Sequence, residues 1–404
     1  MKDIQIIVSH PTGNQNCRSV LAMLEQKQAL AWFGTMLGFT NSKLLNVFPG
    51  RLRCQLFRRY YALSPKKIRI GGIREMVRLT AAAIGWKYLI RHEVGWASID
   101  HVYRTLDQFV ANKLGEPHVR AVYAYEDGAL QTFRKAKERG IRCIYELPIA
   151  YWETVRRLLK EEAERLPEWS STLSEKQDSV AKFERKAEEL ALADLVICPS
   201  HFVMESLPVL GKRMAVIPFG SPPIANLTKR IAGKIRVLFV GTLTQRKGLA
   251  DLFRAIQLLG RKDIELVVLG TPLAPQEFYQ TQCPNFIYEA PRAHHQILEF
   301  MSTCDIFVLP SLVEGRALVI QEAMSRGLPV IITAHTGAAD VIEESDCGFL
   351  VPIRSPESIA EKINLLADSP DLRRAMGEQA RMKAAKMTWE LHGERTWREI
   401  ESLL

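Results

Sequence analysis

The sequence lacks any apolar run long enough to cross a membrane. Its best candidate, residues 81–90, contains Lys87 and has about half of the roughly 20 residues that a spanning helix needs. It also lacks a leader pattern at its start, because Met1-Lys2-Asp3 runs directly into the apolar stretch 4–8. We therefore expect a cytosolic protein that crosses no bilayer.

Recognisable metal and nucleophile motifs are missing as well. The seven cysteines are scattered, and no C-x-x-C, H-E-x-x-H or D-x-D tract is present, so we expect reduced thiols and no metal site. No G-x-S-x-G elbow and no G-x-G-x-x-G loop occurs. The missing elbow argues against a serine hydrolase, and the missing glycine pattern makes the first loop, residues 12–14, a weak phosphate signature.

Positive charge, in contrast, is abundant and unevenly spread. The net charge is +9, and the segment 51–78 holds nine Lys or Arg residues against one acid, Glu75, with Phe57, Tyr60 and Tyr61 among them. Such a basic segment with aromatic residues favours an anionic membrane surface or a solvated helix face. Nucleic acid is the weakest reading, because no nucleic-acid-binding motif accompanies the segment.

Strand-like and helix-like stretches alternate along most of the chain. At 404 residues two domains are expected, and the alternation favours parallel sheets covered by helices. The first series of strands is expected at 4–8, 30–34, 119–125, 142–146 and 194–198, and residues 40–115 give no clear pattern. A Pro- and Gly-rich linker at 217–230 precedes a second series at 235–240, 264–269, 285–288, 305–309, 329–332 and 349–351, with helices from 355 onward.

Two glutamates in the second series carry the most information. Glu314 follows an apolar strand and a tight turn, and Glu322 lies about two helical turns further on. In open parallel sheets, ligands bind outside the carboxyl ends of the strands. One carboxylate at the mouth of such a site and another along the helix suit a ligand rich in hydroxyl groups, such as a sugar nucleotide.

This segment resembles the E-x7-E motif of the family-4 retaining glycosyltransferases with the GT-B fold. The stretches 337–342 and 348–351 match the family's pattern too, and the resemblance covers roughly residues 190–390. It implies an α/β protein of the GT-B type, with two facing Rossmann-like, doubly wound domains and a central cleft. The expected parts are a domain at 1–220, a nucleotide-sugar-binding domain at 221–385 and a returning helix at 386–404, which Trp389 and Trp397 could anchor.

The resemblance also implies roles for the residues of the motif. Glu322 would accept hydrogen bonds from the ribose of the donor, and Glu314 would position the transferred sugar. Backbone amides of the next four residues would face the donor, although relatives often carry Phe-Gly in place of the second and third. These four residues are Gly315, Arg316, Ala317 and Leu318.

A second loop follows the apolar strand 235–240. Arg246 and Lys247 stand at the start of a helix, where two cations would neutralise a diphosphate leaving group. The family usually has a basic residue just after the glycine of this loop, Gly241, whereas this chain has Thr242. We therefore expect Arg246 to supply that charge.

Candidate residues of the first domain lie at the ends of its strands. Gly13 opens a helix, where backbone amides favour an anion, and a plain turn is the alternative. Tyr125 stands where relatives often have a histidine near the reacting carbon, and Glu126 or Glu146 could orient the acceptor hydroxyl or cap a helix. Two further candidates, Ser200 and His294, are expected as helix caps or solvated residues.

The expected function is transfer of a sugar, with retention, from a nucleotide-diphosphate sugar to a glycan or lipid-linked acceptor. No cofactor other than this donor substrate and no metal is expected. The resemblance and the basic segment together favour synthesis of a cell-surface polysaccharide, with the enzyme in the cytoplasm or peripheral on the inner face of the membrane. Two alternatives remain open: a nucleotide-sugar epimerase or hydrolase of the same fold, and a non-catalytic basic protein that binds membrane.

Overall fold

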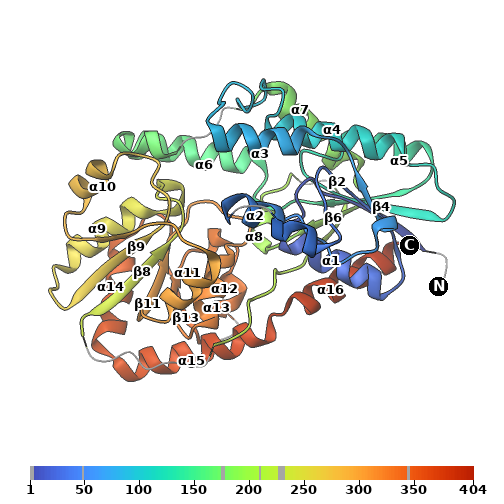
Figure 1. Ribbon diagram of the computed structural model, residues 1–404. Helices are drawn as coiled ribbons and strands as arrows, with labels where there is room; N and C mark the ends of the chain where they lie inside the picture. The colour runs from blue at the N-terminus through green and yellow to red at the C-terminus, as the bar shows by residue number, and fades with distance from the viewer. Residues whose placement is uncertain (1–3, 48–49, 174–177, 209–210, 226–232, 344–345) are drawn as a thin grey trace.

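The computed structural model describes residues 4–47, 50–173, 178–208, 211–225, 233–343 and 346–404. Two parallel sheets lie side by side in it, each covered by helices (Figure 1). The first has the order β3-β2-β1-β4-β5-β6-β7 and the second the order β10-β9-β8-β11-β12-β13. The expected α/β architecture with two doubly wound sheets is therefore confirmed.

The strands of the first sheet are β1 (Gln5–Ser9), β2 (Leu30–Thr35), β3 (Ile68–Ile70), β4 (Val119–Tyr125), β5 (Arg142–Glu146), β6 (Leu195–Cys198) and β7 (Arg213–Val216). Those of the second are β8 (Ile235–Val240), β9 (Ile264–Leu269), β10 (Ile287–Glu289), β11 (Ile306–Leu309), β12 (Val330–Ile332) and β13 (Gly348–Leu350). The sequence did not reveal β3 and β7. Both are edge strands with partly exposed residues, so neither forms the continuous apolar run that marks a buried parallel strand.

Helices of the first half are α1 (Gln15–Gln26), α2 (Gly50–Phe57), α3 (Arg74–Ile84), α4 (Ile99–Asn112), α5 (Leu130–Glu138), α6 (Trp152–Arg165), α7 (Val180–Leu192) and α8 (His201–Glu205). Those of the second half are α9 (Leu249–Leu259), α10 (Gln276–Gln282), α11 (His294–Met301), α12 (Leu318–Ser325), α13 (Ala339–Glu343), α14 (Pro356–Asp368), α15 (Pro370–Lys386) and α16 (Trp389–Leu403). Short 3-10 helices are η1 (Ser42–Val47), η2 (Pro65–Lys67), η3 (Pro167–Thr172), η4 (Gln245–Lys247) and η5 (Ala334–Thr336).

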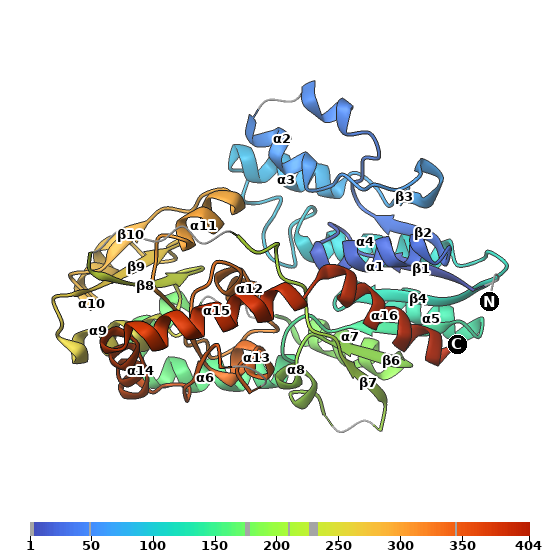
Figure 2. The ribbon, with the colours of Figure 1, turned by 90° about the horizontal axis from the view of Figure 1, so that it is seen from below.

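Two segments of the chain pass between the halves: the linker after β7 and the C-terminal helix α16. The expected linker 217–230 is described as far as residue 225, and 226–230 lie outside the described residues. Helix α16 runs from the second half onto α1 of the first (Figure 2), where His392 Nδ1 and Ser19 Oγ lie 2.6 Å apart. Trp389 stacks near Phe219 at the start of this crossing. The domain boundaries at 220 and 385 stay predictions.

A third crossing was not foreseen and involves α6 and η3, which we call the strap (residues 152–172). Its first residues follow β5 of the first half, yet its end packs in the core of the second half. Trp169 is 1% exposed there and makes edge contacts with Phe253, Phe278 and Tyr279. The strap therefore ties the two halves together with buried apolar surface as well as with the connecting chain.

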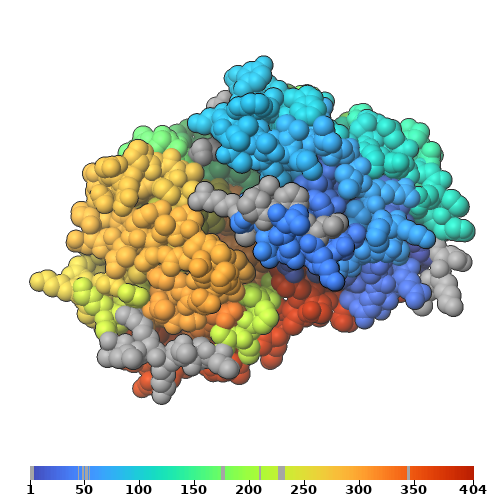
Figure 3. Space-filling view, in the orientation of Figure 1, coloured from blue at the N-terminus to red at the C-terminus, as the bar shows by residue number. Residues whose placement is uncertain are grey.

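The basic segment forms a lobe on the first half, made of α2, β3 and α3. In Figure 3 the blue atoms of this lobe lie beside the orange atoms of the second half, where the surface is hollowed. The lobe is anchored by the buried pair of Arg59 and Glu75. Among the described helices, none combines the length and the apolar character that spanning a membrane requires.

Removal of the Trp169 side chain should destabilise the protein strongly. Trp169→Ala deletes a fully buried indole and its hydrogen bond to Gln282 Oε1, and it leaves a cavity. We expect the free energy of unfolding to fall by about 3–5 kcal/mol, measured by urea unfolding followed by circular dichroism. The matched control is Trp86→Ala, whose indole is 61% exposed and should matter by less than about 0.5 kcal/mol. Equal stability of the two variants would contradict the strap's buried anchor.

Candidate active site

The first candidate glutamate lies in the loop between β11 and α12, at the carboxyl edge of the second sheet. The backbone of this loop is fixed by its neighbour: Glu314 N donates to His335 O at 3.1 Å and Ala317 N to Thr336 O at 3.0 Å. Leu318 is the first residue of α12. The turn thus presents Glu314 at the position that the strand–turn–helix pattern predicts.

Two cations converge on the Glu314 carboxylate. Lys247 Nζ lies 2.5 Å and Arg246 Nη1 3.1 Å from its Oε1. Burial alone would raise the pKa of Glu314, but the charges of Lys247 and Arg246 outweigh it and lower the pKa below its usual value. The carboxylate is therefore ionised, and an excess of positive charge remains around it.

Glycines let the two loops approach each other. Gly248, at the end of η4, has φ +74°, and a Cβ there would lie 2.1 Å from Pro310 O. Gly241 has φ +152°, and its Cβ would meet Lys247 Cδ at 2.8 Å. Thr242 follows in the same loop and is half-buried. Glycine at 241 and 248 thus lets Lys247 lie flat against the backbone and reach Glu314.

Gln245 holds the start of η4 and was missed by the sequence reasoning. Its buried amide nitrogen donates to Glu162 Oε1 at 2.7 Å and to Asp251 Oδ2 at 2.8 Å. Its oxygen accepts from Ala250 N at 2.7 Å. Since Glu162 belongs to the strap, a residue of the first half fixes the loop that carries Arg246 and Lys247. No local sequence signal marks a contact between residues so far apart.

Glu322 faces a different partner. Its Oε1 lies 2.8 Å from His294 Nε2, at the start of α11. The sequence reasoning treated His294 mainly as a cap or a solvated residue, whereas the structure brings it against the second glutamate of the motif. The pair lies at the surface, since the His294 side chain is 62% exposed.

The Arg316 side chain turns away from Glu314. It is buried, and its guanidinium donates to Gly337 O and to both carboxylate oxygens of Asp340 at 2.8–3.1 Å. This is the position where relatives often have phenylalanine. Arg316 therefore ties the loop to α13, and any role toward a donor would fall to its backbone.

The two halves meet directly at Gly315. A Cβ on this residue would lie 1.8 Å from Pro148 O, just after β5 of the first half. Ser200, which the sequence suggested only as a helix cap, caps α8 and also donates its hydroxyl to Gly315 O at 2.7 Å. The backbone of the Glu314 loop is thus clamped between the halves.

At the edge of the first sheet, Gly13 and Tyr125 lie close to a buried histidine. His10 Nδ1 accepts from Gly13 N at 2.7 Å and from Thr12 N at 3.1 Å, and its ring meets Tyr125 at 4.5 Å. Burial, with a smaller contribution from Arg18, lowers the pKa of His10 to about 3, so the ring is neutral and can accept. Gly13 has φ +57°, and a Cβ would clash with the Tyr61 ring at 2.4 Å.

Two buried glutamates of the first half, Glu146 and Glu126, have raised pKa values. Glu146 accepts from Tyr123 Oη at 2.5 Å and from the Asn16 amide. Burial raises its pKa to about 7, although these hydrogen bonds oppose the shift. Burial likewise raises the pKa of Glu126 to about 7 against the charge of Lys186, whose Nζ lies 3.4 Å away.

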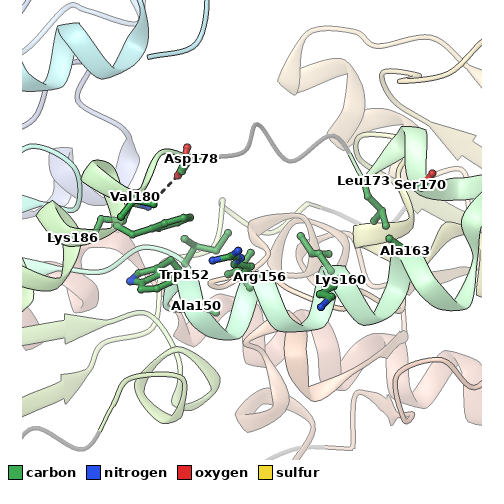
Figure 4. Close-up of a pocket in the computed structure, with 14 residues that line it drawn as sticks. Ala150, Trp152, Arg156, Lys160, Ala163, Ser170, Leu173, Asp178, Val180 and Lys186 are labelled. Atoms are coloured by element: carbon green, nitrogen blue, oxygen red, sulfur yellow. Dashed lines mark ion pairs between the residues drawn. The ribbon is translucent and has the colours of Figure 1, made fainter. Parts of the chain in front are cut away.

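Lys186 also lines a cavity of about 620 Å³ between α6 and α7 (Figure 4). Trp152, Arg156 and Lys160 project from α6 along one side of it. The cavity therefore mixes aromatic surface with positive charge. It reaches from the neighbour of Glu126 to Ser170 on the strap.

One group among the described residues has the composition of a metal site. The ligand atoms of His92, Glu93 and Asp178 lie within 4.8 Å of one another. Lys182 Nζ already stands 2.9 Å from Asp178 Oδ1 and 2.9 Å from Asp100 Oδ1. Because this ammonium occupies the cationic position, we assign no metal there.

Comparisons with known proteins agree with this architecture. Residues 227–383 match the family model described as "Glycosyl transferases group 1". The D-inositol 3-phosphate glycosyltransferase of Corynebacterium jeikeium is 31% identical over 181 residues, which are 41% of this chain and 43% of the relative. The capsular polysaccharide biosynthesis glycosyltransferase CapM of Staphylococcus aureus is 27% identical over 173 residues, 41% of this chain and 44% of CapM.

Solved structures match over nearly the whole chain. HepE of Anabaena, solved in complex with UDP, has a TM-score of 0.64 at 16% identity and covers 99% of this chain and 100% of its own. Sucrose-phosphate synthase of Thermosynechococcus elongatus has a TM-score of 0.63 at 15% identity, with 99% of each chain covered. The fold is that of the GT-B glycosyltransferases. Residues 227–383 are thus similar to the group 1 glycosyl transferases, and the aligned part spans less than half of either named relative.

The residues that the sequence predicts for the site fall into two groups, one in each half of the molecule. Arg246, Lys247, Gly241, Glu314 and Gly315 come together in the second half. Gly13, Tyr125 and Glu126 lie at the ends of the neighbouring strands β1 and β4 of the first half. Their roles stay predictions.

The raised pKa of Glu146 predicts a pH-dependent stability. Between pH 4.5 and about 7 the folded protein keeps this proton and the unfolded chain loses it, so the contribution of Glu146 to stability falls as pH rises. Glu146→Gln removes this loss. At 1.36 kcal/mol per unit, we expect the variant to gain roughly 3 kcal/mol relative to the original protein between pH 4.5 and pH 8, by urea unfolding. Parallel pH profiles would contradict the raised pKa.

Proposed function

We propose that this protein is a retaining glycosyltransferase that uses a nucleotide-diphosphate sugar as donor. The observation that carries the proposal is the convergence of Arg246 and Lys247 on Glu314 at the carboxyl edge of a parallel sheet. Two cations beside one carboxylate suit a diphosphate together with the hydroxyl groups of a sugar. The family match over residues 227–383 supports this reading of the second half.

Donor binding would exchange the partners of these charges. The diphosphate would take over Arg246 and Lys247, and Glu314 would then be free to accept hydrogen bonds from the transferred sugar. Glu322 would receive the ribose hydroxyls, with His294 beside it. As the bond to the leaving phosphate breaks, negative charge grows on its oxygens, and the two cations stabilise that charge in the transition state.

The acceptor would approach from the first half. Tyr125 ends β4 and Glu126 follows it, and Pro148 after β5 touches Gly315 of the Glu314 loop. A glycan or lipid-linked acceptor, in the synthesis of a cell-surface polysaccharide, is the finer part of this proposal. Relatives named for capsular polysaccharide, colanic acid and amylovoran biosynthesis support it.

An exposed apolar surface beside basic residues supports the proposal of a lipid-linked acceptor. Apolar side chains are exposed along α3 and just after it: Ile73, Met76, Ile84, Trp86 and Tyr88 are 49–84% exposed. Lys87 and Arg91 are exposed beside them. An apolar helix face with aromatic and basic flanks is the pattern of a segment that lies in the interface of an anionic bilayer.

The donor site is tested by nucleotide binding. We expect one nucleotide sugar from a panel of UDP-, GDP-, ADP- and dTDP-linked donors to raise thermal stability, by about 2.7 kcal/mol at 100 times its dissociation constant. Lys247→Ala should abolish this shift and lower turnover by roughly 10²–10³-fold. The control Lys262→Ala removes an exposed lysine at the opposite, amino-terminal side of β9. Near-normal binding and turnover in Lys247→Ala would refute the assignment.

Measuring the release of nucleotide, with and without an acceptor, separates transfer from hydrolysis. A transferase should release nucleotide slowly until a sugar acceptor is supplied. Full release without any acceptor would favour a nucleotide-sugar hydrolase of the same fold.

The membrane surface is tested with vesicles. The protein should sediment with vesicles of phosphatidylcholine and phosphatidylserine, and less so as salt screens the basic residues. Trp86→Asp should weaken sedimentation by about tenfold or more, the scale of one buried aromatic side chain. Leu258→Asp is the control, because Leu258 is 46% exposed on α9 of the other half. An equal effect of both substitutions would rule out the α3 face.

A further inference from the structure

Part of the basic segment builds a cavity against the first loop of the chain. This cavity, which we call the arginine pocket, has a volume of about 800 Å³. The loop at Gly13 and the start of α1 form one wall, and residues from the basic segment form the other. Four arginines line it: Arg18, Arg58, Arg59 and Arg78.

The positive charge of the arginine pocket is only partly neutralised. Arg59 and Arg78 share the single carboxylate of Glu75, with Arg78 Nε 2.6 Å from its Oε2. Within the described part of the chain, no ion pair involves Arg18 or Arg58. Four guanidinium groups therefore face one carboxylate, which leaves a net charge of about +3 for an anionic ligand to meet.

Two of these guanidinium groups, those of Arg18 and Arg59, are held in place by the protein itself. Arg18 Nη1 donates to Tyr60 O at 2.6 Å, and its guanidinium lies 4.5 Å from the centre of the Tyr61 ring. Arg59 Nη1 donates to Gln55 O at 2.9 Å. Arg59 is only 5% exposed, yet its Nε has no hydrogen-bond partner among the described residues. A buried guanidinium with an unpaired donor, beside a cavity lined by three further arginines, favours an anionic ligand over a cationic or neutral one.

The arginine pocket lies at the carboxyl edge of the first sheet, the edge that meets the Glu314 loop of the second half. Strands β1, β4 and β5 are neighbours in the first sheet. Gly13 follows β1, and Pro148, which touches Gly315, follows β5. Both loops therefore leave the same, carboxyl edge of the first sheet, two strands apart.

We propose that the arginine pocket binds a phosphate group of the acceptor, as a phosphomonoester or a diphosphate. This inference rests on the proposed glycosyltransferase function, and it assigns the acceptor to the phosphorylated class. Planar guanidinium groups bind phosphate oxygens in pairs, which would fix both the position and the orientation of the acceptor. The pocket is separate from the cations of η4, which belong to the other half of the molecule.

The test uses the Lys247→Ala variant as background, so that phosphate binding by η4 is weakened. Binding of inorganic pyrophosphate is measured by isothermal titration calorimetry at low salt. We expect binding to persist in this background and to weaken roughly ten- to a hundredfold on adding Arg58→Gln, the scale of a lost charged hydrogen bond. Arg58 is exposed, so its loss should leave the fold intact.

A second variant adds charge and removes no charged group. Gln55→Glu places a carboxylate on the exposed wall of the pocket, while the backbone oxygen that holds Arg59 is kept. It should also weaken pyrophosphate binding at least tenfold. The control Arg374→Gln removes one exposed arginine of α15 and should change nothing. Equal binding in all variants, or no binding in the Lys247→Ala background, would overturn the inference.

Further arms identify the source of the phosphate and separate this inference from the donor site. Competition by soluble glucose 6-phosphate would indicate a sugar phosphate, and competition only by vesicles containing phosphatidic acid would indicate a lipid-linked phosphate. Failure of both competitors while pyrophosphate still binds would overturn the acceptor assignment. Nucleotide-sugar binding is measured in parallel on the Arg58→Gln variant with Lys247 intact, and it should be unchanged. If nucleotide sugar binds and pyrophosphate does not, the arginine pocket is refuted and the proposed function stands.

Discussion

The contact between the Glu314 loop and η4 is the constraint on which the rest of the site depends. Lys247 reaches Glu314 because Gly248 lets its loop pass against Pro310, and Gly241 leaves room for the lysine stem. A buried carboxylate beside one cation would be close to balanced, but a second cation, Arg246, leaves positive charge over. An ion pair of this kind is a weak source of stability, because each charge loses its hydration. Under the proposed function, this pair would hold preorganised charge at a place where a diphosphate replaces the carboxylate.

Both halves of the molecule hold this contact in place, which links the geometry of the candidate site to the interface between the halves. Gln245 is gripped by Glu162 of the strap, and Gly315 is clamped between Pro148 and Ser200. If the two halves separated at the Glu314 loop, the contact between Ser200 and Gly315 would break first, because it is a single hydrogen bond. The strap would resist, because Trp169 is buried in the other core and Arg165 pairs with Asp251. Movement between the halves should therefore pivot about the strap.

The sequence predicts the parts of this site that are local, and fails where a contact joins distant segments. Apolar strands and their ends were readable, so Glu314, Lys247 and Gly241 could be placed at a sheet edge by pattern alone. The grip of Glu162 on Gln245 spans 83 positions, and the bond from Ser200 to Gly315 spans 115, so neither leaves a periodic signal. Residues 40–115 were unreadable because α2 and α3 pack as a lobe and β3 is a three-residue edge strand.

The basic segment shows why composition alone left its role open. Nine cations in 28 positions suit a membrane surface, a solvated face or an anionic ligand, because composition does not say which way each side chain faces in the fold. The fold separates these readings in space. The arginines at 59 and 78 turn toward the Gly13 loop, whereas the apolar residues of α3 turn to solvent. A lipid-linked phosphate would use both surfaces at once, with its chain in the bilayer beneath α3 and its phosphate among the arginines. One segment would then select the acceptor by charge and bring it to the donor site by its position in the fold.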